Sequence, residues 1–240
     1  MIKNIIIFGG SGLIGKEIIY YLKKYKLNIL NADLKKSNDK DVSFIKCNVF
    51  KKEDIIKTKN HFIKKFGPIE GIINCFYPRS KNFSMSFEKI NKKDFLGSIQ
   101  AHMGSFFEIN QIFCLYFKKR KKGKIINLSS IYGEFIPRFE IYKNVNFTMP
   151  LQYMVSKNGI IQMTKFLAKL YLKDKININC ISPGGIYDGH DKKFLSKYTK
   201  FTSSNNMLNT KDINTTIKYL LDKDLKMTGQ NLIIDEGFTL

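Results

Sequence analysis

Tyr153 and Lys157 are the pair of side chains in this sequence best suited to acid–base chemistry. They lie four residues apart in a stretch predicted to be helical, and this spacing places both on one face of a helix. A tyrosine hydroxyl has an ordinary pKa of about 10, and a nearby ammonium lowers that pKa by favouring the phenolate. Tyr153 could therefore donate a proton to a reacting oxygen or take one from it. Ser129 and Ser130 end a predicted strand and could supply a hydroxyl that orients the same oxygen.

A glycine-rich turn follows the first apolar run of the chain. Residues 9–15 read GGSGLIG, with glycines at 9, 12 and 15, between a predicted strand and a predicted helix. The glycines would permit a tight turn, let the backbone approach a pyrophosphate, and let the helix pack closely on the strand. Free N–H groups at the start of the helix would bind the phosphate anion. The turn therefore predicts a dinucleotide site.

Asp33 closes the second predicted strand, where its carboxylate would accept hydrogen bonds from the adenosine ribose hydroxyls. The same charge would repel the additional phosphate of NADP, so the sequence predicts NAD as the cofactor in preference to NADP. Lys35 and Lys36 follow closely and could soften this preference. The positive nicotinamide ring of the oxidised cofactor would lower the pKa of Tyr153 further.

The elements that must position these residues alternate along the whole chain. We expect strands over residues 2–8, 27–33, 42–47, 69–75, 124–129, 176–182 and 231–235. We expect helices over about 12–25, 52–66, 92–120, 150–173 and 211–222. Apolar strands separated by helices indicate an α/β fold with a doubly wound parallel sheet of about seven strands and helices on both faces, the Rossmann arrangement. Residues 131–149 and about 184–210 break this rhythm after the carboxyl ends of strands, where such sheets bind ligands.

Length and composition limit the possible classes of protein. The 240 residues fit one α/β domain spanning residues 1–240, and no apolar run reaches the length of a membrane span, so we expect a cytoplasmic protein that does not enter membranes. The four cysteines form no CxxC pair and are expected to be free thiols rather than ligands of a metal. The net charge of +21 comes from lysines spread along the chain, which favours anionic small molecules rather than nucleic acid.

These motifs together resemble the short-chain dehydrogenase/reductase family over essentially the whole chain. The matching segments are residues 9–15, Asp33, residues 47–49, 72–75, 125–130, 153–157, 179–185 and 228–237. The resemblance implies a hydride transfer between a nicotinamide and an alcohol or ketone, in a homodimer or homotetramer built partly on the two long helices. Residues 131–142 followed by Met149 and Pro150 are similar to flagellin-modification oxidoreductases, a group associated with sialic-acid-like sugars.

The resemblance implies a role for each matching residue. Ser130, Tyr153 and Lys157 match the catalytic set, and Lys157 would also hold the nicotinamide ribose. The positions implied to bind the cofactor are Gly9, Ser11, Gly12, Leu13, Ile14, Gly15, Asp33, Asn48, Val49, Asn74, Cys75, Tyr153, Lys157, Pro183, Gly184 and Ile186. Among these, Asn48 and Val49 would line the adenine site, and Asn74 and Cys75 would lie under the cofactor.

The chain departs from the family pattern at several places, among them a loop between Ser130 and Tyr153 that is about ten residues longer than usual. Phe8 replaces the usual threonine before the glycine turn, and residues 74–77 read NCFY instead of NNAG. The helical asparagine that supports a proton relay aligns with Ala101, so Gln100, His102 or water would have to serve instead. We expect His102 to be a packed helix residue.

Arginine is rare in this lysine-rich chain, and two of its arginines lie on predicted pocket loops. Arg79 follows the fourth strand and Arg138 lies in the loop between Ser130 and Tyr153. A planar guanidinium suits a carboxylate or phosphate, so both are predicted to bind an anionic, sugar-like substrate, with Tyr142 beside them. Residues 187–207 could form a lid over this site.

Other classes of protein remain possible from the sequence. A nucleotide-sugar epimerase or dehydratase with bound NAD has a similar glycine turn, although 240 residues leave little room for its sugar-binding domain. A non-catalytic dinucleotide-binding regulator would not need Ser130, Tyr153 and Lys157 together. A nucleic-acid binder would show weak binding that vanishes at moderate salt.

Overall fold

The computed structural model describes residues 1–37, 39, 41–79 and 82–240, in which seven parallel strands form one sheet. The strand order is β3-β2-β1-β4-β5-β6-β7, which is the predicted doubly wound arrangement. The strands are β1 (Asn4–Phe8), β2 (Asn28–Asp33), β3 (Ser43–Lys46), β4 (Gly71–Asn74), β5 (Gly123–Leu128), β6 (Ile176–Pro183) and β7 (Asn231–Ile234). In the central register, Ile6 of β1 lies opposite Leu30 of β2 and Ile72 of β4.

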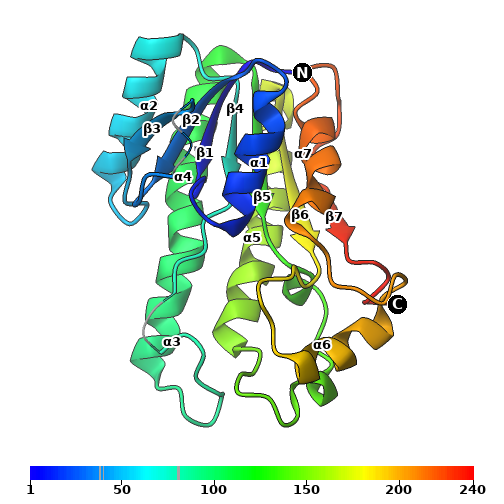
Figure 1. The fold of residues 1–240 in the computed structure, drawn as a ribbon. Coiled ribbons are helices and arrows are strands. Elements are labelled where there is room, and N and C mark those ends of the chain that lie inside the picture. Colours follow the sequence, from blue (N-terminus) through cyan, green and yellow to red (C-terminus); the bar gives the residue numbers. More distant parts are fainter. Residues whose placement is uncertain (38, 40, 80–81) are drawn as a thin grey trace.

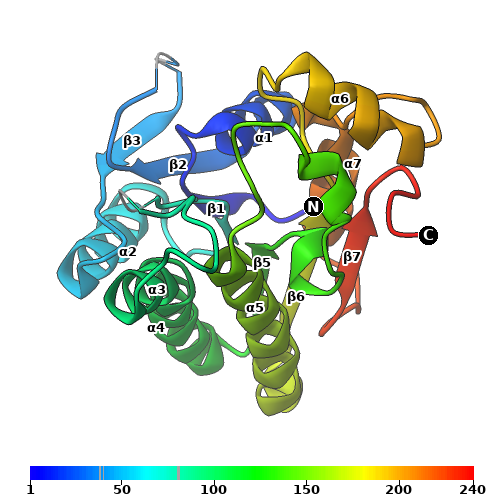
Figure 2. The same ribbon diagram turned by 90° about the horizontal axis from the view of Figure 1, so that it is seen from below.

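Helices cover both faces of the sheet (Figures 1 and 2). They are α1 (Leu13–Lys23), α2 (Lys52–Phe66), α3 (Lys92–Ile99), α4 (Ser105–Arg120), α5 (Leu151–Leu170), α6 (Lys192–Tyr198) and α7 (Asn214–Leu220). Helices α1 and α7 lie on one face, and α2, α4 and α5 lie on the other (Figure 2). Within the part of the chain that the structure describes, no helix has the length and apolar character needed to cross a membrane.

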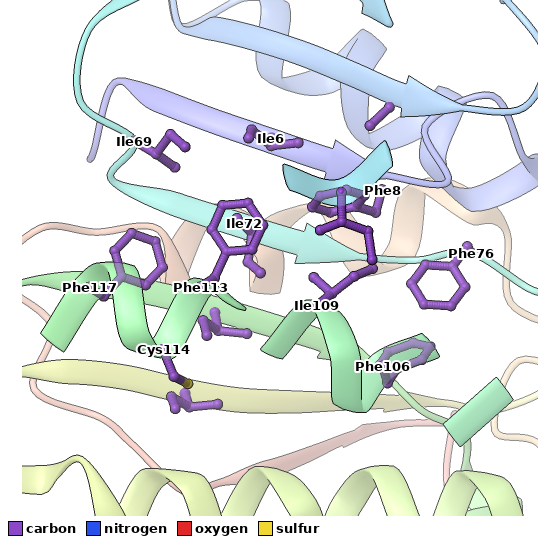
Figure 3. Close-up of a cluster of buried hydrophobic side chains, with 14 of the residues drawn as sticks. Ile6, Phe8, Ile69, Ile72, Phe76, Phe106, Ile109, Phe113, Cys114 and Phe117 are labelled. Carbon is purple, nitrogen blue, oxygen red and sulfur yellow. The ribbon is translucent and has the colours of Figure 1, made fainter. Parts of the chain in front are cut away.

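The alternation of side chains along β1 explains how one strand supports both layers. Ile6 and Phe8 point into the core shared with α2, α4 and α5, whereas Ile5 and Ile7 point into the core shared with α1 and α7. All four side chains are fully buried, as expected for a central parallel strand. Figure 3 shows the first of these cores, where Phe8 packs edge-on against Phe113 of α4 with ring centroids 5.7 Å apart.

The structure differs from the predicted elements in two places. The helix expected over residues 92–120 is interrupted by a π-helical turn over Gln100–Gly104, which separates α3 from α4. Residues 184–210, expected to be irregular, contain α6, whose N-cap Asp191 accepts hydrogen bonds from the N–H groups of Lys193 and Phe194.

A third buried cluster covers the carboxyl end of the sheet beside β6 and β7. It joins the loop after β5, helix α6 and the last residues of the chain. Its buried members are Ile131, Tyr132, Ile141, Tyr142, Phe194, Tyr198, Met207 and Phe238. Both irregular stretches predicted from the sequence therefore pack together at one end of the molecule.

Candidate active site

A cavity of about 930 Å³ opens at the carboxyl ends of the central strands. Its walls include residues that directly follow β1, β4, β5 and the end of β6. The chain leaves β1 toward one edge of the sheet and leaves β4 toward the other, so the cavity lies at the topological switch point where open α/β sheets bind ligands.

Most of the predicted site residues line this one cavity. They are Gly9, Ser11, Gly12, Leu13, Ile14, Asp33, Asn48, Val49, Cys75, Arg79, Ser130, Tyr153, Lys157, Pro183, Gly184 and Ile186. The glycine turn and Asp33 lie beside β1 and β2, and Tyr153 with Lys157 lies on α5.

The glycine turn has the close contacts that its residue types suggest. Gly9 has a φ of +86°, and a Cβ placed there would lie 2.5 Å from the backbone N and Cα atoms of Phe76. A Cβ at Gly15 would lie 2.2 Å from the carbonyl oxygen of Gly9, so helix α1 can pack this close to the turn only with glycine. Gly12 is the N-cap of α1 and supplies no side-chain cap. The first-turn N–H groups of α1 are thus free of a side-chain acceptor and suited to a phosphate.

Asp33 joins the end of β2 to the glycine turn. Its carboxylate accepts hydrogen bonds from the N–H groups of Ser11 (3.0 Å) and Lys35 (3.2 Å). The Ser11 hydroxyl donates to the carbonyl oxygen of Lys35 and accepts from the Asn31 amide. This network holds the turn in place and keeps the Asp33 carboxylate in the cavity wall.

The acid–base residues meet where β5 ends above α5. Lys157 donates from Nζ to the carbonyl oxygen of Leu128 (3.0 Å), and its Nζ lies 5.6 Å from the centroid of the Tyr153 ring. The Ser129 hydroxyl donates to the carbonyl oxygen of Lys157, which ties β5 to α5. The Ser130 hydroxyl accepts from the Tyr132 N–H and also bonds to the Tyr153 side chain. Ser130 therefore faces the phenol, whereas Ser129 anchors the helix.

Burial sets the charge state of this group more than its neighbours do. Burial raises the pKa of Tyr153, against the lowering effects of the Ser130 hydrogen bond and the Arg79 charge. Burial also lowers the pKa of Lys157 to about 8, so the ammonium is still largely protonated at pH 7. The expectation that Lys157 by itself makes Tyr153 more acidic is therefore wrong for the protein without cofactor.

Two residues predicted to bind substrate lie outside the cavity wall. The Arg138 guanidinium lies 4.3 Å from the Phe201 ring centroid and donates to the carbonyl oxygens of Phe238 (3.4 Å) and Leu240 (2.9 Å). Tyr142 is buried in the third cluster, where its hydroxyl donates to that of Tyr132 (3.0 Å). Contacts within the loop packing, which loop sequence does not reveal, hold both side chains outside the cavity wall.

Asn74 and Gly15 also differ from the expected cofactor contacts. Asn74 is fully buried, and its amide donates to the Asn127 side chain (2.8 Å), which in turn donates to the Thr164 hydroxyl (3.0 Å). This polar chain links β4, β5 and α5 below the cavity. Gly15 provides room for packing against the turn and does not line the cavity wall.

The cavity also has an aromatic wall formed by residues that follow β4. Tyr77 and Phe83 line it, and the Tyr77 ring lies edge-on to the Tyr153 ring with centroids 5.6 Å apart. The Arg79 guanidinium lies 4.7 Å from the Tyr77 ring centroid. The departure from the family pattern at residues 74–77 was the available signal for Tyr77, whereas nothing in the sequence marked Phe83.

His102 lies directly behind this wall, in the π-helical turn. Its ring packs against Tyr77, Phe83 and Tyr153 with centroids 5.0, 5.4 and 6.2 Å away. It is 1% exposed, and burial together with the Lys157 charge lowers its pKa to about 3. His102 is therefore a packed, neutral histidine, in agreement with the expectation from the sequence.

The opposite wall comes from the segment before α6. His190 and Asp188 line the cavity with Phe147, and the His190 ring stacks on Phe194 at 5.3 Å between centroids. The Asp188 N–H donates to Nδ1 of His190 (3.2 Å). Because Nδ1 is the acceptor, the neutral ring carries its hydrogen on Nε2.

A parallel sheet with a glycine-rich turn and a partly buried Tyr153 beside Lys157 in one cavity is typical of one class, the dinucleotide-dependent oxidoreductases. Comparison with known proteins makes the assignment specific. The family model described as Enoyl-(Acyl carrier protein) reductase matches residues 17–239. Post-translational flagellin modification protein A of Campylobacter coli is 33% identical over 256 aligned positions, covering 100% of both chains. The chain belongs to the short-chain dehydrogenase/reductase family.

Solved structures have the same architecture. A short chain dehydrogenase from Leptospira borgpetersenii with bound NAD+ superposes with a TM-score of 0.90 at 28% identity, covering 99% of this chain and 93% of that one. ElxO with NADP bound shares the fold at a TM-score of 0.83 and 22% identity, with coverage of 100% and 99%. The protein is thus an NAD(P)-dependent oxidoreductase that acts on a CH–OH group.

Proposed function

We propose that this protein is an NAD-preferring oxidoreductase that interconverts an alcohol and a ketone on a small, anionic, sugar-like substrate. One observation carries the proposal: Ser130, Tyr153 and Lys157 share a single cavity with the glycine turn and Asp33. The cavity thus combines an anion-binding helix end, a carboxylate for a ribose, and a proton donor.

The glycine turn, with Gly12 as the N-cap of α1, would hold the pyrophosphate of the dinucleotide, and Asp33 would accept hydrogen bonds from the adenosine ribose. Asn48 and Val49 would contact the adenine, and Pro183, Gly184 and Ile186 would lie against the nicotinamide end. NAD(H), when bound, supplies or accepts the hydride.

The chain's own residues supply the proton chemistry. Ser130 hydrogen-bonds the substrate oxygen, and Tyr153 donates a proton to that oxygen during reduction or removes it during oxidation. The raised pKa of Tyr153 keeps the phenol protonated at neutral pH, which is the form that can donate a proton. The Lys157 side chain, held by the Leu128 carbonyl oxygen beside the Tyr153 ring, would bind the nicotinamide ribose.

Arg79 supports an anionic substrate. It is an exposed residue in the cavity wall with its guanidinium over the Tyr77 ring, and the planar guanidinium fork matches a carboxylate or phosphate. The relative that is 33% identical is named for flagellin modification, and the resemblance to that group is the reason we expect a sugar-like substrate. Arg138 and Tyr142 are not part of this proposal, because they lie outside the cavity wall.

We also propose a cytoplasmic homodimer or homotetramer that associates partly through α4 and α5. Both helices carry large apolar side chains on exposed positions, including Phe107 (52% exposed) and Phe166 (66%). Exposed side chains of this size on two adjacent helices favour a protein contact. Light scattering after size-exclusion chromatography measures the oligomer directly, and a monomer at micromolar concentration would contradict the proposal.

Cofactor choice is tested by titrating the protein with NADH and NADPH. We expect tighter binding of NADH. Asp33→Asn should weaken NADH binding about tenfold, because a hydrogen bond to a charged acceptor contributes about 1.5–3 kcal/mol. The same substitution should narrow the difference between the two cofactors. Equal affinity of the unaltered protein for both would contradict the preference for NAD.

Substrate class is tested by NADH oxidation with matched pairs of ketosugars that differ only in one carboxylate or phosphate. We expect turnover of the anionic member and a KM for it that rises at least about tenfold in Arg79→Ala, with partial recovery in Arg79→Lys. Arg120→Ala provides a control, because Arg120 stacks on Tyr116 on α4, away from the cavity. Equal use of the neutral and anionic members would contradict an anionic substrate.

A further inference from the structure

Arg138 connects the loop after β5 to the last residues of the chain. Its guanidinium stacks on Phe201 at 4.3 Å and lies 5.8 Å from the Phe238 ring centroid. It also donates to the carbonyl oxygens of Phe238 and Leu240. A lysine could not make this set of contacts, because it lacks the planar face and the forked donors.

The last six residues are held by further hydrogen bonds. The Asp235 carboxylate accepts from the N–H groups of Gly237 and Thr239 and from the Thr239 hydroxyl. The Glu236 carboxylate accepts from the Ser203 hydroxyl and the Ser204 N–H. Residues 235–240 are thereby fixed to the segment that follows α6.

Phe238 and Tyr198 connect the terminal segment to the cavity wall. Their rings stack almost parallel, with centroids 4.2 Å apart and an interplanar angle of 11°, and each is 2% exposed. The Tyr198 hydroxyl accepts a hydrogen bond from the Gly185 N–H (2.6 Å). Gly185 lies between Gly184 and Ile186 in the cavity wall.

The contact between this support and the wall is close. A Cβ at Gly184 would lie 3.0 Å from Cβ of Asp235, and one at Gly185 would lie 2.9 Å from the Tyr198 hydroxyl oxygen. The two glycines therefore let the wall rest directly on Tyr198 and on the start of the terminal segment. Movement of either would change the backbone of Gly184 and Gly185.

We propose that Arg138, Tyr198 and residues 235–240 form a brace that fixes the backbone of residues 184–186 in the cavity wall. Arg138 is in this view a positioning residue rather than a substrate ligand. The consequence for cofactor affinity rests on the proposed function, in which residues 183–186 contact the nicotinamide end. Loss of the brace should make residues 184–186 more mobile and so weaken cofactor binding. The effect is indirect, because in this proposal the brace residues do not contact the cofactor.

The brace is tested first without cofactor, by hydrogen–deuterium exchange at residues 184–187. We expect at least about tenfold faster exchange there in a chain ending at residue 237 and in Arg138→Ala. Arg138→Lys should have a smaller effect. Tyr198→Phe keeps the ring stack but removes the acceptor of the Gly185 N–H, so it should raise exchange at Gly185 alone. Arg120→Ala, which removes another stacked arginine, should leave exchange unchanged.

Unchanged exchange at residues 184–187 in both Tyr198→Phe and Arg138→Ala, with thermal unfolding like that of the unaltered chain, would overturn the brace. This result is independent of any cofactor. If the chain ending at residue 237 does not fold, Tyr198→Phe and Arg138→Ala still test the brace.

Cofactor binding is tested second, by NADH titration of the same variants. We expect a five- to twentyfold weaker affinity in Arg138→Ala and in the chain ending at residue 237. By linkage, NADH must in turn slow exchange in residues 235–240 of the unaltered protein. An affinity within twofold of the unaltered chain, despite faster exchange, would show that the brace does not act on the cofactor. An unaltered protein that binds neither NADH nor NADPH would refute the proposed function, while the exchange experiment would still decide the brace.

Discussion

His102 should make the protein sensitive to mild acid, and the size of this effect follows from its burial. The side chain is 1% exposed and is packed among the rings of Tyr77, Phe83 and Tyr153. Burial and the Lys157 charge lower its pKa from the ordinary 6.5 to about 3. A proton that binds the unfolded imidazole readily therefore binds the folded one poorly.

The sign of the effect follows from proton binding in the two states. Between pH 3 and 6.5 the unfolded chain binds more protons at His102 than the folded chain does. The free energy of unfolding therefore rises with pH across this window and decreases as the pH falls. At pH 5 the unfolded imidazole lies about 1.5 pH units below its pKa, which corresponds to about 2 kcal/mol at 1.36 kcal/mol per unit. At pH 7 the same effect is about 0.2 kcal/mol.

His102→Phe is the matched perturbation, because it keeps an aromatic ring among aromatic neighbours and removes the titrating group. Urea unfolding followed by circular dichroism measures the stability, which is convenient because the chain contains no tryptophan. Between pH 7 and pH 5 the unaltered protein should lose about 2 kcal/mol more than His102→Phe loses. His61→Gln, which replaces an exposed histidine on α2, is the control and should behave like the unaltered protein. Equal losses in the unaltered protein and in His102→Phe would refute the reasoning.

Three further predictions follow from the site. Tyr153→Phe should lower turnover by at least about a hundredfold and leave the affinity for NADH within twofold, because it removes only the proton donor. Rapid kinetics with a substrate from the ketosugar panel measures this effect. Retained turnover would contradict the role of Tyr153. Oxidation of the product alcohol should speed up as the pH rises above neutrality, because the raised pKa of Tyr153 keeps the phenol protonated and unable to take a proton at lower pH; a pH–rate profile that is flat would contradict this. Gly9→Ala should lower the free energy of unfolding in urea by at least about 2 kcal/mol, because Gly9 has a φ of +86° and its Cβ would lie 2.5 Å from the Phe76 backbone. Gly67→Ala is the control, since Gly67 has a φ of +81° and no atom within 4 Å of its Cβ. It should lower the free energy of unfolding by less.

The order of the elements could be predicted because it depends on local patterns. Each strand is a short apolar run, and most strands are followed closely by an amphipathic helix. The pattern of apolar residues therefore predicts the seven strands, the bounds of α2 and the doubly wound arrangement. The glycine turn, Asp33, and the set of Ser130, Tyr153 and Lys157 were recognisable for a similar reason. Each follows the carboxyl end of a strand or lies on a helix, and parallel topology brings such positions to one edge.

The tertiary structure alone decided what the loops do. Arg138 and Arg79 both lie on loops that follow strands. Arg138 donates a hydrogen bond to Leu240 in the terminal segment, whereas Arg79 lines the cavity. The partners of Arg138, Phe238 and Leu240, lie about a hundred residues away in sequence, as the separations of 100 and 102 show. The direction of the Tyr153 pKa shift was likewise missed, because it depends on how much of the phenol is buried by Tyr77 and Phe83 from another loop. Local sequence determines which elements form, whereas contacts between distant segments determine which side chains remain free to meet a ligand.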